Sequence, residues 1–189
     1  MAINRRIGSI LISAACLVVA GAVGWSFTAK SGGAPVAAAT ASPKSLGLSG
    51  LAIPRFVSLK ADKVNVRRGP SSDHGVAWVF QRKGMPVEIV AESDNWRRIR
   101  DSDGEEGWIL QNMLAGKRTA SVAPWKMGET LPLHSAAEKA SGLVAMMSAG
   151  VMAEVSTCSG EWCEISAGGY EGWIEQTMLW GVYPGEVVE

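Results

Sequence analysis

Residues suited to catalysis are scarce in this sequence of 189 residues, which has only 2 histidines and 3 cysteines. The histidines, His74 and His134, have no closely spaced cysteine or carboxylate cluster beside them, so the sequence predicts no metal site and no cofactor. A nucleophilic enzyme would need Cys158 or Cys163 next to a positioned base, and neither histidine is close to them in sequence. We therefore expect a protein that is not an enzyme.

Net charge is also lacking, because 18 basic residues balance 18 acidic ones. A neutral chain is a poor candidate for general nucleic-acid binding, and we expect no nucleic-acid partner. The balance conceals an asymmetry, however. Residues 55–118 contain 12 basic and 9 acidic residues, a net charge of +3, whereas residues 119–189 contain 2 and 9, a net charge of −7. The two halves are therefore expected to attract different partners.

One uncharged run, residues 7–27, is long enough to cross a bilayer as a helix, and Arg5 and Arg6 precede it. Basic residues before such a run place its start in the cytoplasm and direct the rest outward. We expect residues 1–29 to be a signal peptide or a membrane anchor, so that the N-terminal segment engages the membrane.

Three fates of this segment remain open. A small-x-small site at residues 20–22 would allow cleavage, the full run would serve as an uncleaved anchor, and Cys16 would be the modified residue of a lipoprotein. Each places the remaining chain outside the cytoplasm. We expect an exported, periplasmic protein that is soluble after cleavage or tethered to the inner membrane. Residues 30–54, rich in Ala, Gly, Ser and Pro, are predicted to be a flexible linker.

The rest of the chain contains an internal repeat. Trp96 corresponds to Trp162 at an offset of 66 residues, and the sequence Gly-Trp-Ile at 107–109 returns at 172–174. Both copies close on Gln-x-Met-Leu-x-Gly. We assign repeat 1 to residues 55–118 and repeat 2 to residues 119–189.

Each copy is predicted to be all-β. Short stretches such as "MPVEIVAES" and "NWRRIRD" alternate apolar and polar residues and are separated by glycine-rich turns. About five such strands in about 60 residues, without a helical period, are typical of a small barrel or a tightly rolled sheet. "DSDGEE", at residues 101–106, lacks the ligand spacing of an EF-hand and is predicted to be a hairpin turn.

These motifs resemble a known family. "VNVRRGPS", the glycine before "MPVEIV", "NWRRIR" and "GWI" are similar to the motifs of bacterial SH3-like (SH3b) domains, and residues 55–185 resemble exported proteobacterial proteins with two such domains in tandem. The resemblance implies two tandem small SH3-like β-barrels after an N-terminal signal or anchor helix. It also implies targeting to the cell envelope, often through binding of cell-wall peptide or glycan when a wall hydrolase domain is attached. We expect no hydrolase domain in this sequence, which weakens that implication.

Candidate ligand-binding residues lie mainly in repeat 1. In "WRRIR", strand alternation places Trp96, Arg98 and Arg100 on one face, where an aromatic ring beside cations suits a wall peptide or a sugar. A solvated strand surface explains the same pattern. Trp78 is a further aromatic candidate, and Arg67 is a further cationic one. The tryptophans of the two Gly-Trp-Ile motifs are expected to be core or rim residues.

Cys158 and Cys163 flank "SGEW", a loop of the length that closes a hairpin, and an exported protein permits disulfides. We expect the two residues to be bridged, with two free thiols as the alternative.

Two functions are compatible with these features. The first is a non-catalytic cell-envelope binding module that docks to peptidoglycan or to a wall-associated protein. The second is a structural or adaptor protein that mediates protein-protein interaction in the periplasm, its acidic second repeat pairing with a basic partner.

Overall fold

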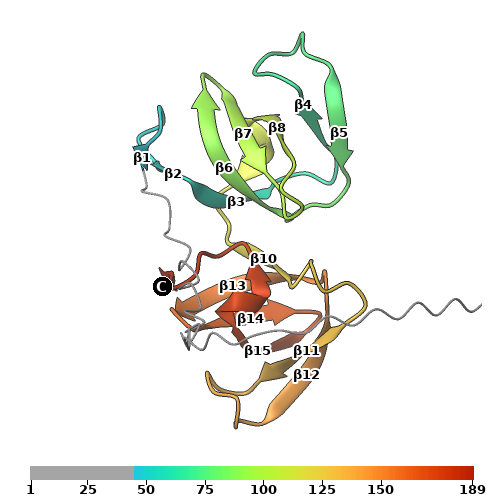
Figure 1. Cartoon of the computed structure of the whole chain (residues 1–189), viewed down its shortest axis with the longest axis vertical. Coiled ribbons are helices and arrows are strands. Elements are labelled where there is room, and N and C mark those ends of the chain that lie inside the picture. Colours follow the sequence, from blue (N-terminus) through green and yellow to red (C-terminus); the bar gives the residue numbers. More distant parts are fainter. Residues whose placement is uncertain (1–44) are drawn as a thin grey trace, which may run out of the picture. The chain divides into compact units, whose positions relative to one another are not determined.

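The computed structural model describes residues 45–189, which lie within one compact unit (Figure 1). These residues form β-strands and two short 3₁₀ helices, with no α-helix among them, which confirms the all-β prediction. No helix in residues 45–189 is long and apolar enough to span a membrane. The predicted signal or anchor segment, residues 1–29, lies outside the described residues, as do residues 30–44 of the predicted linker.

Repeat 1 is a seven-stranded antiparallel sheet with the strand order β5-β4-β8-β7-β6-β3-β9. A 3₁₀ helix, η1, connects β8 to β9. The elements are β3 (Arg55–Leu59), β4 (Val64–Arg67), β5 (Val76–Phe80), β6 (Pro86–Ser93), β7 (Trp96–Arg100), β8 (Glu106–Leu110), η1 (Gln111–Met113) and β9 (Leu114–Ala115).

Repeat 2 is an antiparallel sheet with the order β12-β11-β15-β14-β13-β10-β16, and an additional strand, β17, pairs with β13. The elements are β10 (Thr119–Val122), β11 (Thr130–His134), β12 (Leu143–Ser148), β13 (Met152–Ser159), β14 (Trp162–Ala167), β15 (Tyr170–Glu175), η2 (Gln176–Met178), β16 (Leu179–Trp180) and β17 (Val187–Val188).

The two sheets have equivalent strand orders (Figure 1). The repeat in the sequence therefore corresponds to two copies of the same topology. Even the irregularities recur. Register shifts between Val66 and Arg67 in β4 and between Leu133 and His134 in β11 fall at equivalent positions. The two sheets are therefore interrupted at the same point of the ladder.

Neither sheet closes into the predicted barrel. The end strands of repeat 1, β5 and β9, do not pair with each other, and neither do β12 and β16 of repeat 2. The last strand in each order, β9 or β16, follows a 3₁₀ helix and is only two residues long. It pairs with one neighbour, β3 or β10. The SH3-like barrels expected from the sequence are therefore open, curled sheets.

Alternation of apolar residues builds one core in each repeat. In β4, for example, Val64 and Val66 are buried while Asn65 between them is exposed. Buried side chains of repeat 1 form one cluster: Leu59, Val64, Val66, Phe80, Val87, Ile89, Ile99 and Ile109. The corresponding cluster of repeat 2 includes Val122, Leu131, Leu133, Met147, Val155, Cys158, Cys163, Ile165 and Ile174.

The glycine of each Gly-Trp-Ile motif is required by a close approach between strands. A Cβ atom on Gly107 would lie 2.3 Å from Val66 Cγ1, and one on Gly172 would lie 2.6 Å from the carbonyl oxygen of His134. Both contacts are too short for any side chain, so the motif fixes how closely β8 approaches β4 and β15 approaches β11. Trp108 and Trp173 follow these glycines and are half-buried, whereas the next residue in each copy is buried.

Part of the predicted flexible linker is ordered. β1 (Ser45–Leu46) and β2 (Ala52–Ile53) pair as a short hairpin directly before β3. Ser49, in the turn of this hairpin, donates its backbone N–H and its hydroxyl to the Glu92 carboxylate, both at 2.7 Å. The hairpin is therefore attached to β6 of repeat 1.

The two repeats differ in what joins their longest strands. In repeat 1, Glu92 on β6 lies opposite Arg97 on β7, and the two form a buried ion pair at 3.3 Å. In repeat 2 the equivalent register position holds Cys158 and Cys163, which form a disulfide. The predicted bridge is thus confirmed, and it occupies the place that a charged pair occupies in repeat 1.

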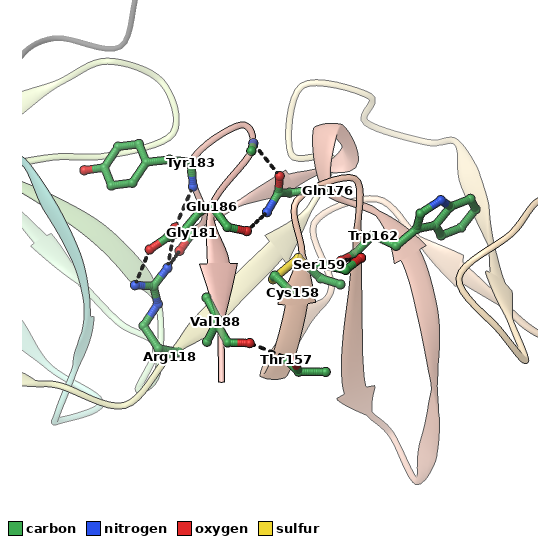
Figure 2. Close-up of a disulfide and its surroundings, with 12 residues drawn as sticks. Arg118, Thr157, Cys158, Ser159, Trp162, Gln176, Gly181, Tyr183, Glu186 and Val188 are labelled. Carbon is green, nitrogen blue, oxygen red and sulfur yellow. Dashed lines mark hydrogen bonds and ion pairs between the residues drawn. A yellow bond between two sulfur atoms is a disulfide. The ribbon is translucent and has the colours of Figure 1, made fainter.

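The chain after β16 folds back beside this disulfide (Figure 2). Arg118 binds both carboxylate oxygens of Glu186, at 3.0 and 2.8 Å, and Thr157 donates its hydroxyl to the carbonyl of Val188. The buried side chain of Gln176 accepts from the N–H of Gly185 and donates to the carbonyl of Glu186, both at 2.7 Å. The C-terminal segment is therefore an integral part of repeat 2.

We predict that Glu92 makes the stability of this protein sensitive to acid. Burial raises the pKa of its carboxyl group, but hydrogen bonds from Ser49 and Arg55 and the charge of Arg97 outweigh burial and lower the pKa from 4.5 to about 2. Because the folded-state pKa lies below the unfolded one, this stabilisation is complete above about pH 5 and is lost as the pH falls towards 2.

Glu92→Gln is expected to lower the free energy of unfolding at pH 7 by about 3 kcal/mol, because it leaves Arg97 buried without its counter-charge. Urea unfolding at several pH values measures both effects. Glu161→Gln, on an exposed turn, serves as the control. An unchanged acid dependence in Glu92→Gln would contradict the assignment.

Candidate functional site

The predicted strip on β7 exists as a surface, but its cations are paired. Burial along the strand alternates as expected, with Arg97 and Ile99 buried and Arg98 exposed. Arg98 contacts Glu106 at 2.8 Å. Arg100 contacts Glu106 at 2.7 Å and Glu88 at 3.2 Å. An anionic ligand on this strip would have to compete with both glutamates.

Trp78 serves the core. Its ring packs against the buried cluster of repeat 1 and lies edge-on to Phe80, with ring centroids 6.0 Å apart. Its indole Nε1 is buried and has no hydrogen-bond partner within residues 45–189. The structure therefore gives Trp78 a packing role and does not bring it to the strip.

Two of the predicted residues meet in a small cavity, which we call the Trp96 cavity. Trp96 and Arg67 line this space of about 130 Å³ together with Lys63, Asn65, Leu110 and Met113. Arg67 donates to the carbonyl of His74 at 2.6 Å, which orients its guanidinium without neutralising its charge. The lining thus combines two basic residues with apolar ones.

A larger cleft, of about 660 Å³, lies where residues of both repeats come together. A cleft of this size falls in the range of ligand pockets. Its lining consists of Ser58, Leu59, Lys60, Lys83, Gly84, Ala115, Lys117, Thr119, Met152, Ala153, Glu154, Ser166, Ala167 and Gly168. We call it the inter-repeat cleft.

The inter-repeat cleft is positively charged. Lys117 pairs with Glu154, the only acidic residue of the lining, whereas Lys60 and Lys83 are exposed and have no ion-pair partner within residues 45–189. Much of the remaining lining is Gly, Ala and Ser, whose small side chains leave backbone groups within reach of a ligand. The cleft can therefore bind an extended anionic ligand through charge and backbone hydrogen bonds.

Sequence reasoning missed this cleft because its lysines are far apart in the chain. The turn before β6 brings them together. Gly84 takes a positive φ of 78°, a conformation favoured by glycine, and its N–H donates to the carbonyl of Leu59 at 2.8 Å. Lys60 and Lys83 flank these two residues and so reach the same cleft.

Contacts between the repeats hold the walls of the cleft together. Thr119 donates its hydroxyl to the carbonyl of Gly84 at 2.7 Å, and the Trp180 indole donates to the carbonyl of Pro86 at 3.3 Å. Phe56, buried in β3, lies with its ring centroid 5.1 Å from Trp180 and 4.7 Å from Tyr183. Aromatic and polar contacts together join the two sheets.

Tyr183 adds a charged hydrogen bond to this junction. Its hydroxyl donates to the Glu88 carboxylate at 2.9 Å. Burial of the ring, followed by the negative charge of Glu88, raises the pKa of Tyr183 well above its usual value. The phenol therefore stays protonated and continues to donate throughout the physiological pH range.

The "DSDGEE" segment is a turn, as predicted. Asp101 is buried, and its carboxylate accepts from the N–H groups of Asp103 and Glu105 at 3.0 and 2.9 Å. Within residues 45–189 no three His, Cys, Asp or Glu side chains lie together as metal ligands would.

Comparison with known proteins identifies related sequences. A family model described as "Bacterial SH3 domain" matches residues 60–116 and 127–181. YrvJ of Bacillus subtilis (strain 168), provisionally described as an N-acetylmuramoyl-L-alanine amidase, is 24% identical over 128 residues. This match covers 64% of the chain but 24% of YrvJ, so the chain spans about a quarter of that relative's length.

Two solved structures are also similar. NlpC2 from Trichomonas vaginalis is 14% identical, with a TM-score of 0.31, and the match covers 67% of this chain and 48% of that one. NlpC1 from the same organism is 15% identical, with a TM-score of 0.30, over 67% of this chain and 45% of that one.

We predict that Tyr183→Phe weakens the junction between the repeats. The substitution keeps the ring against Phe56 but removes the hydrogen bond to the Glu88 carboxylate, a bond type worth about 2 kcal/mol. Denaturant unfolding should show a loss of this size. Tyr170→Phe, at the exposed start of β15, should change stability little. Equal stabilities of the two variants would rule out the proposed contribution.

Proposed function

This chain belongs to the bacterial SH3 domain family, which it matches in two tandem copies, and on that basis we propose that it is a non-catalytic binding module of the cell envelope. The observation that carries the proposal is the inter-repeat cleft, in which Lys60 and Lys83 are exposed and have no acidic partner among residues 45–189. Its ligand is an acidic polymer of the envelope, for which the carboxylates of cell-wall peptides are the most suitable groups.

The balance of charge supports an anionic ligand. Three lysines and one glutamate line the cleft, and the lysine that is paired, Lys117, makes its contact on an exposed surface. Exposed ion pairs contribute little, so a ligand carboxylate can take the place of Glu154 at small cost. The name of the B. subtilis relative, an N-acetylmuramoyl-L-alanine amidase, agrees with a sugar-peptide ligand.

The disulfide supports export. Disulfides persist in oxidising compartments, such as the bacterial periplasm, and the Cys158–Cys163 bridge lies in the core of repeat 2. We therefore place the protein outside the cytoplasm, in the periplasm, either soluble or tethered through residues 1–29.

Sedimentation of the protein with purified wall sacculi tests the proposal. Lys60→Glu combined with Lys83→Glu should weaken binding by about tenfold, because it reverses both free charges of the cleft. Binding of the parent protein should fall as salt rises beyond about 0.1 M, where the Debye length is about 10 Å. Lys63→Glu combined with Arg68→Glu makes the same charge change on exposed residues outside the cleft.

The same assay distinguishes the alternatives. A loss with Lys63→Glu and Arg68→Glu, or with Trp96→Ala and Arg98→Ala, but not with the cleft variant would place the ligand at the Trp96 cavity or on the β7 strip. Salt-insensitive binding, or no binding to sacculi, would contradict the proposal and favour a protein-protein adaptor in the periplasm.

A further inference from the structure

Repeat 2 contains a cavity at the position of the Trp96 cavity. It has a volume of about 230 Å³ and is lined by Trp162, which occupies the place of Trp96. The two cavities lie between equivalent elements, since Arg67 pairs with Trp108 in repeat 1 and His134 pairs with Trp173 in repeat 2. Further equivalent pairs in the two linings are Asn65 and Pro132, Arg67 and His134, Leu110 and Glu175, and Met113 and Met178.

The residues that line the two cavities carry net charges of opposite sign. The lining of the Trp96 cavity includes Lys63 and Arg67 and no carboxylate. The cavity of repeat 2, which we call the Trp162 cavity, has the carboxylates of Glu129 and Glu175, with Lys126 as its one lysine. The two cavities are therefore expected to prefer ligand groups of opposite charge.

We propose that the Trp162 cavity binds a primary ammonium group carried on a short alkyl chain. Glu129 and Glu175 supply charge-assisted hydrogen bonds to the ammonium, and the indole of Trp162 supplies an aromatic surface that attracts cations. Leu131, Ile174 and Met178, in the same lining, contact the alkyl chain. This site is separate from the inter-repeat cleft and does not depend on the function proposed for it.

The protein's own lysines show that the two carboxylates accept this group. Lys139 places its ammonium 2.7 Å from Glu175, and Lys126 places its ammonium 3.2 Å from Glu129. The lysine side chain is itself an alkylammonium. The side chain of Lys139 is 77% exposed, so its ion pair is weak and can be displaced by a ligand that also gains contact with Trp162.

The adjacent histidine adds an unused polar group. His134 lines the cavity, and its ring lies edge-on to Trp162 with centroids 5.5 Å apart. Its Nδ1 is buried and has no hydrogen-bond partner in the part of the chain that the structure describes. An unsatisfied polar atom is costly to bury, so its retention beside a cavity agrees with a binding role.

Titration of the full chain with n-butylammonium chloride, followed by ¹⁵N–¹H NMR, tests the proposal. We expect saturable shifts of the Trp162 indole signal. Glu175→Gln should weaken binding about fivefold, and Lys139→Met, which removes the competing lysine, should tighten it about two- to fivefold. Glu171→Gln, an exposed residue of the same strand, should have no effect.

The controls separate charge recognition from simple filling of an apolar space. Sodium butyrate and butanol, with chains of similar length, should leave the Trp162 signal unchanged. Equal shifts with butanol, or equal affinities of Glu175→Gln and Glu171→Gln for butylammonium, would overturn the proposal. Neither result would affect the sacculus assay of Lys60→Glu with Lys83→Glu, which concerns the other site.

Discussion

Each repeat depends on a cross-link at one register position of its longest strand pair. The position can hold a buried ion pair, Glu92 with Arg97, or a disulfide, Cys158 with Cys163. The ion pair and the disulfide differ in the hydrogen-bond partners that they require. A buried carboxylate must be satisfied on all sides, whereas a disulfide has no charge to satisfy.

The residues around each cross-link reflect this difference. Glu92 is satisfied by Ser49, 43 residues away in the chain, and by Arg55, so the β1–β2 hairpin becomes part of repeat 1. Cys158 needs no such partner, and the strand edge beside it is available to β17, whose Val188 pairs with it. The two repeats thus differ both in the cross-link and in the terminal segment that adjoins it.

Sequence patterns predicted the β class, the duplication and the disulfide, because each is recorded in local spacing. The Gly-Trp-Ile motifs were found by their offset, and the cysteines by the length of the loop between them. The ordered hairpin and the open sheets were not predicted, since they depend on long-range contacts such as Ser49 with Glu92. The inter-repeat cleft was missed for the same reason, because Lys60 and Lys83 are brought together only by the turn at Gly84. The strip of Trp96, Arg98 and Arg100 was placed on the correct face, but the pairing of its cations with Glu106 required the fold.

Only charged side chains that form no ion pair within the protein are available to bind a ligand. The two repeats differ in which charged side chains these are. In repeat 1 the arginines of β7 form ion pairs with glutamates. Lysines and arginines without an ion pair among residues 45–189 line the inter-repeat cleft and the Trp96 cavity. Core positions keep their apolar character between repeats, as Ile109 and Ile174 do. Positions at the cavity rim, such as Leu110 and Glu175, lie outside both cores and can change charge with little effect on packing. Duplication of this sheet therefore provides two copies of one cavity whose ligand preference is set at the rim, independently of the residues that stabilise the fold.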